Sequence, residues 1–157
     1  MKKILVAYYS RTGTTRKVAE LIAQKLGAEL EEIKDTVDRS GIKGYLLSGR
    51  DATLKRLTEL YPIAKNPADY DLVLVGTPIW SWNVSAPIRT YVTQQKNNLK
   101  SVAYFCTMGG SGDGRAFGTL TEISGQKPLA TLSLTTREVV AGDIEKSITD
   151  FTEKLRD

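Results

Sequence analysis

Short apolar runs and amphipathic helical patterns alternate along this chain. The apolar runs lie at 4–9, 72–75 and 102–106. They are apolar throughout, which is typical of parallel strands that are buried on both faces of a sheet. Helical patterns with one apolar stripe lie at about 14–26, 86–95 and 115–124. This alternation predicts repeated β-α-β units around a parallel sheet.

Two further segments have the pattern of edge strands. Segment 28–33 carries three carboxylates, and segment 129–135 alternates apolar residues with hydroxyl residues. Each therefore has one wet face, so we expect them at the two edges of the sheet. If the five strands are numbered along the chain, the order across the sheet that buries the three apolar strands and leaves these two at the edges is 2-1-3-4-5. The sequence thus predicts an α/β fold of one domain over residues 1–157, a doubly wound three-layer sandwich with a five-stranded parallel sheet.

The remaining segments have weaker patterns. The last helix is predicted to begin after Asp143, which is a good N-cap residue, and to bury Ile144, Ile148, Phe151 and Leu155. Glycines and a proline interrupt the leucines of segment 36–66, for which we predict one helix near 40–56 and a long approach to the third strand.

The turn between the first strand and the first helix has the composition of a phosphate site. It reads Ser10-Arg11-Thr12-Gly13-Thr14-Thr15. The turn places backbone N–H groups at the positive end of a helix dipole, and its hydroxyls add short uncharged donors, which suits a terminal phosphate. Only one glycine is present and no Gly-Lys-Ser/Thr follows, so a dinucleotide or a nucleoside triphosphate is disfavoured. A Thr-rich helix cap without a ligand is the alternative interpretation.

Two more candidate loops follow the third and fourth strands. The first spans Gly76–Val84 and offers the large aromatic surfaces of Trp80 and Trp82 to a flat ligand. The second spans Thr107–Gly114, where several glycines allow a close backbone approach to a ligand edge. In the predicted order, the loops after strands one, three and four meet at one crevice. The alternative is that the tryptophans are core or partner-binding residues and that the glycine turn is a connector.

Composition narrows the chemistry. The 157 residues contain no histidine and one cysteine, Cys106, so histidine-based acid–base or nucleophile chemistry is excluded and any chemistry is expected to belong to a cofactor. Cys106 is expected to be a buried residue at a strand end rather than a redox thiol. The net charge of +4 comes from scattered residues, so we expect no nucleic-acid binding. No long apolar run is present, so we expect a cytoplasmic protein without membrane insertion.

These motifs together resemble the flavodoxin-like family of FMN proteins over essentially the whole chain, and specifically its short-chain type. Ser10–Thr15 is similar to the family's phosphate loop, Gly76–Trp80 to the loop whose tryptophan stacks on the isoalloxazine ring, and Gly109–Gly114 to the loop at the ring's far side and pyrimidine edge. The resemblance implies FMN as the cofactor. The residues it assigns to cofactor binding are Ser10, Arg11, Thr12, Gly13, Thr14, Thr15, Pro78, Ile79, Trp80, Ser81, Trp82, Asn83, Val84, Thr107, Met108, Gly109, Gly110 and Asp113.

Three features depart from the family's electron carriers. The chain is net basic, whereas those carriers are typically acidic around the flavin. Ser81 follows Trp80 where those carriers have a flexible glycine, and Gly114–Phe117 lacks the tyrosine that often covers the second face of the ring. An uncovered ring face would admit a substrate such as a quinone or a nicotinamide.

We therefore predict an FMN-binding electron-transfer protein with no catalytic residue or metal site of its own. Its partner is a redox protein or a small electron donor or acceptor such as a quinone or NAD(P)H. One alternative is an FMN-dependent NAD(P)H or quinone oxidoreductase, including a protoporphyrinogen oxidase-like activity. The other is a non-catalytic binding scaffold with Trp82 exposed to a partner.

Overall fold

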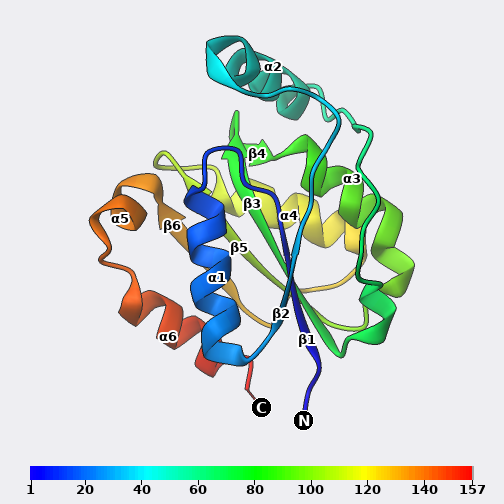
Figure 1. Ribbon diagram of the computed structural model, residues 1–157, viewed down its shortest axis with the longest axis vertical. Coiled ribbons are helices and arrows are strands. Elements are labelled where there is room, and N and C mark those ends of the chain that lie inside the picture. The colour runs from blue at the N-terminus through cyan, green and yellow to red at the C-terminus, as the bar shows by residue number, and fades with distance from the viewer. Residues whose placement is uncertain (157) are drawn as a thin grey trace.

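Five parallel strands form the centre of the molecule (Figure 1). They are β1 (Ile4–Tyr8), β2 (Glu29–Glu32), β3 (Leu72–Trp80), β5 (Val102–Met108) and β6 (Thr131–Thr135). Their order across the sheet is β2-β1-β3-β5-β6, which confirms the predicted order when the parallel strands are counted along the chain. This structure is a computed structural model, and it describes residues 1–156.

Burial along the strands follows the predicted pattern. All five residues of β1 are buried, whereas β2 and β6 alternate between buried and more exposed residues. β2 pairs only with β1 and β6 only with β5, so both are edge strands as predicted. Strands that are apolar throughout thus lie inside the sheet, and strands with polar positions lie at its edges.

Helices cover both faces of the sheet (Figure 1). On one face lie α1 (Thr14–Leu26), the short α5 (Thr136–Ala141) and α6 (Glu145–Glu153), and on the other lie α3 (Ala86–Gln95) and α4 (Asp113–Ser124). Val18 and Ile22 of α1 join one core cluster, and Ile88 of α3 and Leu120 of α4 join the other. The four residues predicted to be buried by the last helix are all buried, which confirms that prediction. Helix α5 was not predicted.

Segment 76–84 is not the loop that the sequence predicted. β3 continues to Trp80, and the chain then reverses into the short strand β4 (Asn83–Val84), which pairs antiparallel with β3. Ser81 and Trp82 form the two-residue turn, with φ values of 47° and 60°. Such a turn requires positive φ at both positions and usually contains asparagine or glycine. Neither residue is present, so the sequence carried no hairpin signal.

Helix α2 (Gly41–Thr53) confirms the helix predicted near 40–56. It lies apart from both helical layers, beyond the end of the sheet where β1 and β3 finish (Figure 1). The remaining short elements are the 3₁₀ turns η1 (Pro67–Asp69) and η2 (Lys96–Asn98). No helix in residues 1–156 has both the length and the apolar character needed to cross a bilayer.

Candidate functional site

The turn after β1 meets the carboxyl-terminal residues of β3 and β5 in one cavity. Its volume is about 260 Å³. It is lined by Ser10, Arg11, Thr12, Thr14, Thr15, Tyr45, Pro78, Ile79, Trp80, Thr107, Met108, Gly109 and Thr136. Eleven of these thirteen residues belong to the set predicted from the sequence, because parallel strands bring their carboxyl ends to the same edge of the sheet.

The first turn of α1 forms the polar wall of this cavity. Its N-cap residue, Gly13, has a φ of 98°, and no side chain caps the helix. The Ser10 hydroxyl oxygen accepts a hydrogen bond from the Gly13 N–H at 3.0 Å, which closes the turn. The Thr15 hydroxyl is 2.8 Å from that of Thr107, so this buried pair ties the turn to the end of β5.

These donors fit a phosphate group. No side chain caps the helix, so its first N–H groups are open to a ligand, and Thr12 and Thr14 also line the cavity. No acidic residue stands in the first turn to repel an anion. Arg11 also lines the cavity, but its guanidinium donates to the backbone oxygens of Arg39 at 2.8 Å and Gly41 at 2.9 Å. This wall of the cavity is therefore built mainly from neutral groups and a helix dipole.

The two tryptophans occupy different environments. Trp80 is only 9% exposed, and its ring forms a T-shaped pair with that of Tyr9, with 5.4 Å between centroids and an interplanar angle of 86°. Trp82 is 64% exposed, and its indole N–H donates to the Ser111 hydroxyl at 3.1 Å. The hairpin thus directs Trp80 to the cavity and leaves Trp82 at the rim.

The other predicted residues are distributed around this centre. Ser81, Trp82 and Gly110 line a neighbouring cavity of about 340 Å³. Asn83 and Val84 are buried within the hairpin. Asp113 accepts a hydrogen bond from Ser133 at 2.7 Å, and Gly13 lies in the cap of α1. These last four line neither cavity.

Sequence reasoning missed two cavity residues, Tyr45 and Thr136. Tyr45 lies in α2, within segment 36–66. Glycines interrupt the apolar pattern of this segment, so the sequence did not indicate where its helix lies relative to the sheet. Thr136 begins α5, and its hydroxyl donates to the Met108 carbonyl oxygen at 3.4 Å. Only its position in the sequence could have indicated Thr136 as a cavity residue. It follows β6, which runs parallel to β5 and so ends at the same edge of the sheet.

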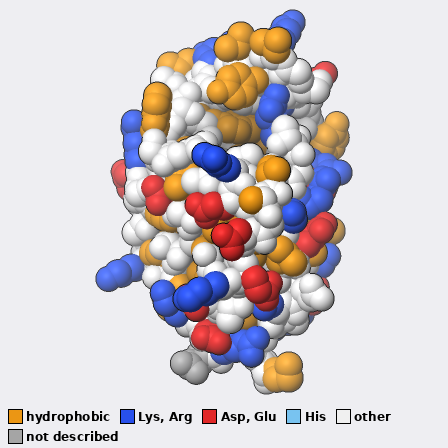
Figure 2. All heavy atoms as spheres, turned by 90° about the vertical axis from the view of Figure 1, so that its left-hand side faces the viewer, with side chains coloured by type: hydrophobic (Ala, Val, Ile, Leu, Met, Phe, Trp, Pro, Cys, Tyr) orange, Lys and Arg blue, Asp and Glu red, His pale blue; other side chains and the backbone are white. Residues whose placement is uncertain are grey.

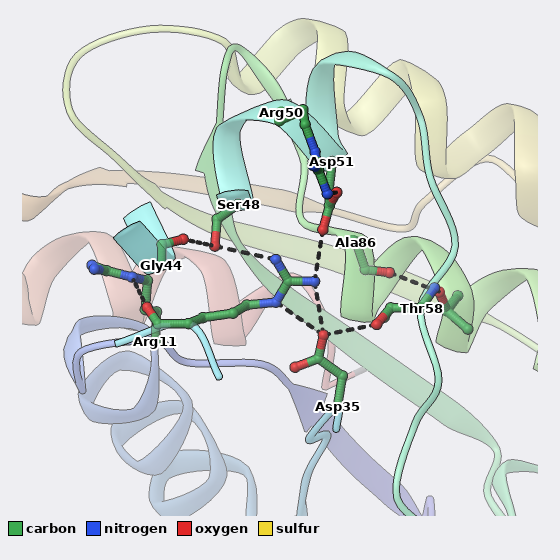
Figure 3. A network of polar contacts seen from close by, with 10 residues as sticks. Arg11, Asp35, Gly44, Ser48, Arg50, Asp51, Thr58 and Ala86 are labelled. Carbon is green, nitrogen blue, oxygen red and sulfur yellow. Dashed lines mark hydrogen bonds and ion pairs between the residues drawn. The ribbon is translucent and has the colours of Figure 1, made fainter. Parts of the chain in front are cut away.

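A buried arginine joins α2 to the rest of the molecule (Figure 3). The Nη2 atom of Arg39 is 2.8 Å from Asp35 and 3.1 Å from Asp51, and its Nη1 donates to the Ser48 hydroxyl at 3.2 Å. Thr58, which follows α2, donates to Asp35 at 2.9 Å. The network therefore connects the segment before α2, the helix itself and the segment after it.

The same guanidinium lies against the candidate site. The Cζ atom of Arg39 is 5.1 Å from the centroid of the Trp80 ring, within the range of a cation–π contact. Burial lowers the pKa of Arg39, but the hydrogen bonds and charges of Asp35 and Asp51 outweigh burial and raise it overall. Arg39 thus stays charged and contacts Trp80 from within its ion-pair network.

Cys106 takes no part in this site. It is fully buried in β5, and burial raises the pKa of its thiol to about 12. A neutral buried thiol is a poor nucleophile. Within residues 1–156, no cluster of three or more Cys, Asp and Glu side chains could hold a metal ion.

The fold and the cavity define a doubly wound α/β protein with a crevice at the point where the strand order reverses. Comparison with known proteins then identifies the family. The sequence model of the flavodoxin family matches residues 50–150, and the chain belongs to this family.

Solved structures agree with this assignment. A flavoprotein from Lactobacillus acidophilus NCFM, solved in complex with FMN, is 31% identical and superposes with a TM-score of 0.69 over 90% of this chain and 98% of its own. A Bacteroides eggerthii DSM 20697 protein described as a flavoprotein is 25% identical, with a TM-score of 0.72 over 94% of this chain and 98% of its own.

One curated relative has an enzyme name. It is NAD(P)H dehydrogenase (quinone) 3 of Rhizobium meliloti (strain 1021), which is 31% identical over 103 residues. The match covers 60% of this chain and 44% of the relative, so the chain spans less than half the length of that protein.

Proposed function

We propose that this protein binds FMN in the crevice at the ends of β1, β3 and β5 and transfers electrons through it. The observation that carries the proposal is one cavity in which an uncapped helix N-terminus, several hydroxyls and a nearly buried tryptophan meet. The first two suit a phosphate and the third suits a flat ring. Membership of the flavodoxin family, together with the FMN complex of the Lactobacillus acidophilus relative, supports FMN as the cofactor.

Each part of the crevice has a distinct role in this proposal. The first turn of α1 and the hydroxyls of Ser10, Thr12 and Thr14 would hold the phosphate. Trp80 would contact the isoalloxazine ring, and the backbone of Thr107–Gly110 would contact its polar edge. FMN supplies the redox chemistry when bound. The chain's own contribution is to bind the cofactor, orient it and set the polarity around it.

The cavity lining favours electron transfer over acid–base chemistry. Among its described lining residues there is no carboxylate and no lysine, and the whole chain contains no histidine. The one cation, Arg11, is held by two backbone oxygens. Apart from the Tyr45 phenol and the aliphatic hydroxyls, the cavity lining therefore offers no side chain that could exchange a proton with a substrate.

A second function is an FMN-dependent NAD(P)H or quinone oxidoreductase. The name of the Rhizobium meliloti relative favours it, as does the cavity of about 340 Å³ that adjoins the crevice and could admit a substrate. Steady-state oxidation of NADH or NADPH by the purified protein, with FMN and a soluble quinone present, distinguishes the two functions. Turnover favours the oxidoreductase. Absence of turnover, together with rapid exchange of electrons with a redox protein, favours the carrier.

Calorimetric titration of the protein with FMN and with riboflavin tests the phosphate site. Hydrogen bonds to a charged group contribute about 1.5–3 kcal/mol each, so riboflavin is expected to bind at least tenfold more weakly than FMN. Thr14→Ala should weaken FMN and leave riboflavin unchanged. Thr119→Ala, in α4 and outside both cavities, is the matched control. Equal affinities for the two ligands would refute the phosphate assignment, and binding of neither would favour the scaffold.

Fluorescence tests the position of the ring. FMN should quench tryptophan emission, and Trp80→Phe should remove most of that quenching because Trp80 lines the crevice. Trp82→Phe should change it little, since that side chain lies at the rim. The opposite result would show that the assignment of the two tryptophans is reversed.

A further inference from the structure

We propose that Tyr45 of helix α2 is a second aromatic contact for the isoalloxazine ring of FMN, in addition to Trp80 of β3. The inference rests on the proposed function, and it adds a residue and an element that the sequence had not connected to the cofactor. It also assigns a role to α2, which lies beyond the two helical layers of the fold (Figure 1).

Tyr45 has a central position among the cavities at this end of the molecule. It lines the crevice of about 260 Å³ beside the phosphate loop and the neighbouring cavity of about 340 Å³. It also lines a third cavity of about 310 Å³, between α2 and the hairpin, where Leu46, Ile79 and Trp80 are its neighbours. A ligand that extends from the phosphate loop along Trp80 would therefore meet Tyr45.

The Tyr45 side chain is largely exposed to solvent although it is aromatic. Tyr45 is 65% exposed, beside Ile42 at 82% and Leu46 at 65%. In the space-filling view, hydrophobic side chains gather at the upper end of the molecule, which α2 forms (Figure 2). Exposed apolar groups at the mouth of a cavity are typical of a ligand-binding site. Of these three residues, Tyr45 lines all three cavities, whereas Leu46 lines one and Ile42 lines none.

The loop after β5 does not supply an aromatic ring to the crevice. Its nearest candidate in sequence, Phe117, stacks on Tyr104 with 6.3 Å between centroids and an interplanar angle of 23°. That contact belongs to the core cluster on the α3 and α4 side of the sheet. That segment therefore supplies no aromatic side chain to the crevice, whereas α2 supplies Tyr45.

Fixed contacts hold Tyr45 over the crevice. The Cζ atom of Arg11 is 5.7 Å from the centroid of the Tyr45 ring, and the Arg11 guanidinium bonds to the backbone at the start of α2. At the other end of the helix, a Cβ on Gly49 would lie 3.1 Å from the Ser81 hydroxyl, so α2 approaches the hairpin closely there. The Arg39 network fixes the segments on both sides of the helix (Figure 3).

This placement predicts a specific binding signature. A ring contact stabilises the isoalloxazine of FMN and riboflavin alike, whereas a phosphate contact stabilises FMN alone. Aromatic contacts contribute modestly, so loss of the Tyr45 ring should weaken both ligands by about tenfold. Loss of the hydroxyl alone should change neither.

The experiment measures FMN and riboflavin affinity, by flavin fluorescence titration of the purified apoprotein, for Tyr45→Ala and Tyr45→Phe. Ile42→Ala is the matched control, because it changes an exposed apolar residue of the same helix that lines none of these cavities. We expect equal losses of about tenfold for both ligands in Tyr45→Ala, and wild-type affinity in Tyr45→Phe and Ile42→Ala. Far-ultraviolet circular dichroism and thermal unfolding verify that each apoprotein is folded.

Three results would overturn the proposal while leaving the proposed function intact. The first is wild-type affinity for both flavins in Tyr45→Ala. The second is a loss for FMN alone, which would show that Tyr45 acts through Arg11 on the phosphate. The third is an equal loss in Ile42→Ala, which would show a general effect on α2. Failure of the wild-type protein to bind either flavin would instead refute the proposed function, and with it this inference.

Discussion

At the scale of single residues, the two-residue turn of the β3–β4 hairpin holds a strained backbone next to the crevice. Ser81 and Trp82 have φ values of 47° and 60°, a region that costs a residue with a side chain about 1–2 kcal/mol. The turn carries Trp80 on one side and directs Trp82 to the rim. Strain of this kind persists when surrounding contacts determine the conformation, here the pairing of Trp80 with Asn83.

Ser81→Gly should therefore stabilise the protein. Glycine adopts positive φ without steric cost, and its greater freedom in the unfolded chain offsets part of the gain, so we expect about 0.5–1 kcal/mol in the free energy of unfolding. Urea denaturation measures this change. Ser101→Gly is the control, because Ser101 is not among the residues with positive φ and should lose stability on the same change. A loss of stability in Ser81→Gly would contradict the strain argument.

Burial is the main influence on the reactivity of Cys106. Its thiol has a pKa raised from 9.0 to about 12 by desolvation, despite hydrogen bonding with Ser133 and Leu134 that lowers it. In the unfolded chain the same thiol ionises near pH 9. The unfolded state thus releases this proton first, so the stabilising contribution of the neutral thiol is complete below pH 9 and is lost as pH rises toward 12.

Cys106→Ala should reduce the loss of stability at alkaline pH. One such group contributes a slope of about 1.4 kcal/mol per pH unit between the two pKa values, and the variant lacks that slope. Urea denaturation at pH 7, 9 and 10.5 measures the difference between the two proteins, and the tyrosines titrate equally in both. Parallel pH profiles for wild type and variant would show that the thiol ionises normally in the folded protein.

At the scale of elements, α2 depends on a buried ion-pair network rather than on an apolar face. Its buried residues are Gly44, Ser48, Asp51 and Ala52, and only the last is hydrophobic. Arg39 and Asp35 side chains are each 2% exposed and Asp51 is 9% exposed, so the charges that hold the helix have little access to water. Buried charges of this kind are costly when one partner is removed.

Arg39→Met should destabilise the protein by about 3–5 kcal/mol, because it leaves Asp35 buried without a cation and leaves Asp51 with only the half-exposed Arg50. Amides of α2 should lose protection from hydrogen exchange before those of β1. Lys146→Met is the control, because it removes an exposed pair with Asp150 and should cost less than about 1 kcal/mol. Equal losses in the two variants would show that the Arg39 network does not anchor α2.

At the scale of the whole molecule, the parallel sheet brings distant segments of the chain to one edge. The cavity is lined by residues from Ser10 to Thr136, and α2 adds Tyr45 from beyond the sheet. Because the ligand would contact groups that come together only in the folded state, its binding is coupled to folding of the whole domain.

FMN should therefore raise the stability of the entire protein in a concentration-dependent way. A ligand at one hundred times its dissociation constant adds about 2.7 kcal/mol to the free energy of unfolding. Thermal unfolding across a range of FMN concentrations measures the effect. At one fixed FMN concentration, Thr14→Ala should show a smaller rise than wild type, with an unchanged melting temperature in the apoprotein. A melting temperature independent of FMN would show that the folded state has no preferential affinity for it.

Local patterns in the sequence were sufficient for the parallel strand order, the two edge strands and the turn between β1 and α1 that lines the cavity. The reason is that burial on two faces, burial on one face and a helix start are each encoded in neighbouring residues, as in β1 and the turn before α1. The meeting of the carboxyl ends of β1, β3 and β5 at one edge then follows from the geometry of a parallel sheet.

The tertiary structure decided the features that depend on contacts between distant residues. The β3–β4 hairpin forms although Ser81 and Trp82 disfavour its turn, because the paired backbone outweighs their local preference. The Arg39 network connects Asp35, Asp51 and Thr58, and no short sequence motif indicates that these residues are in contact. The position of Tyr45 follows from this network and the Arg11 contact, so only the folded chain shows that α2 belongs to the site.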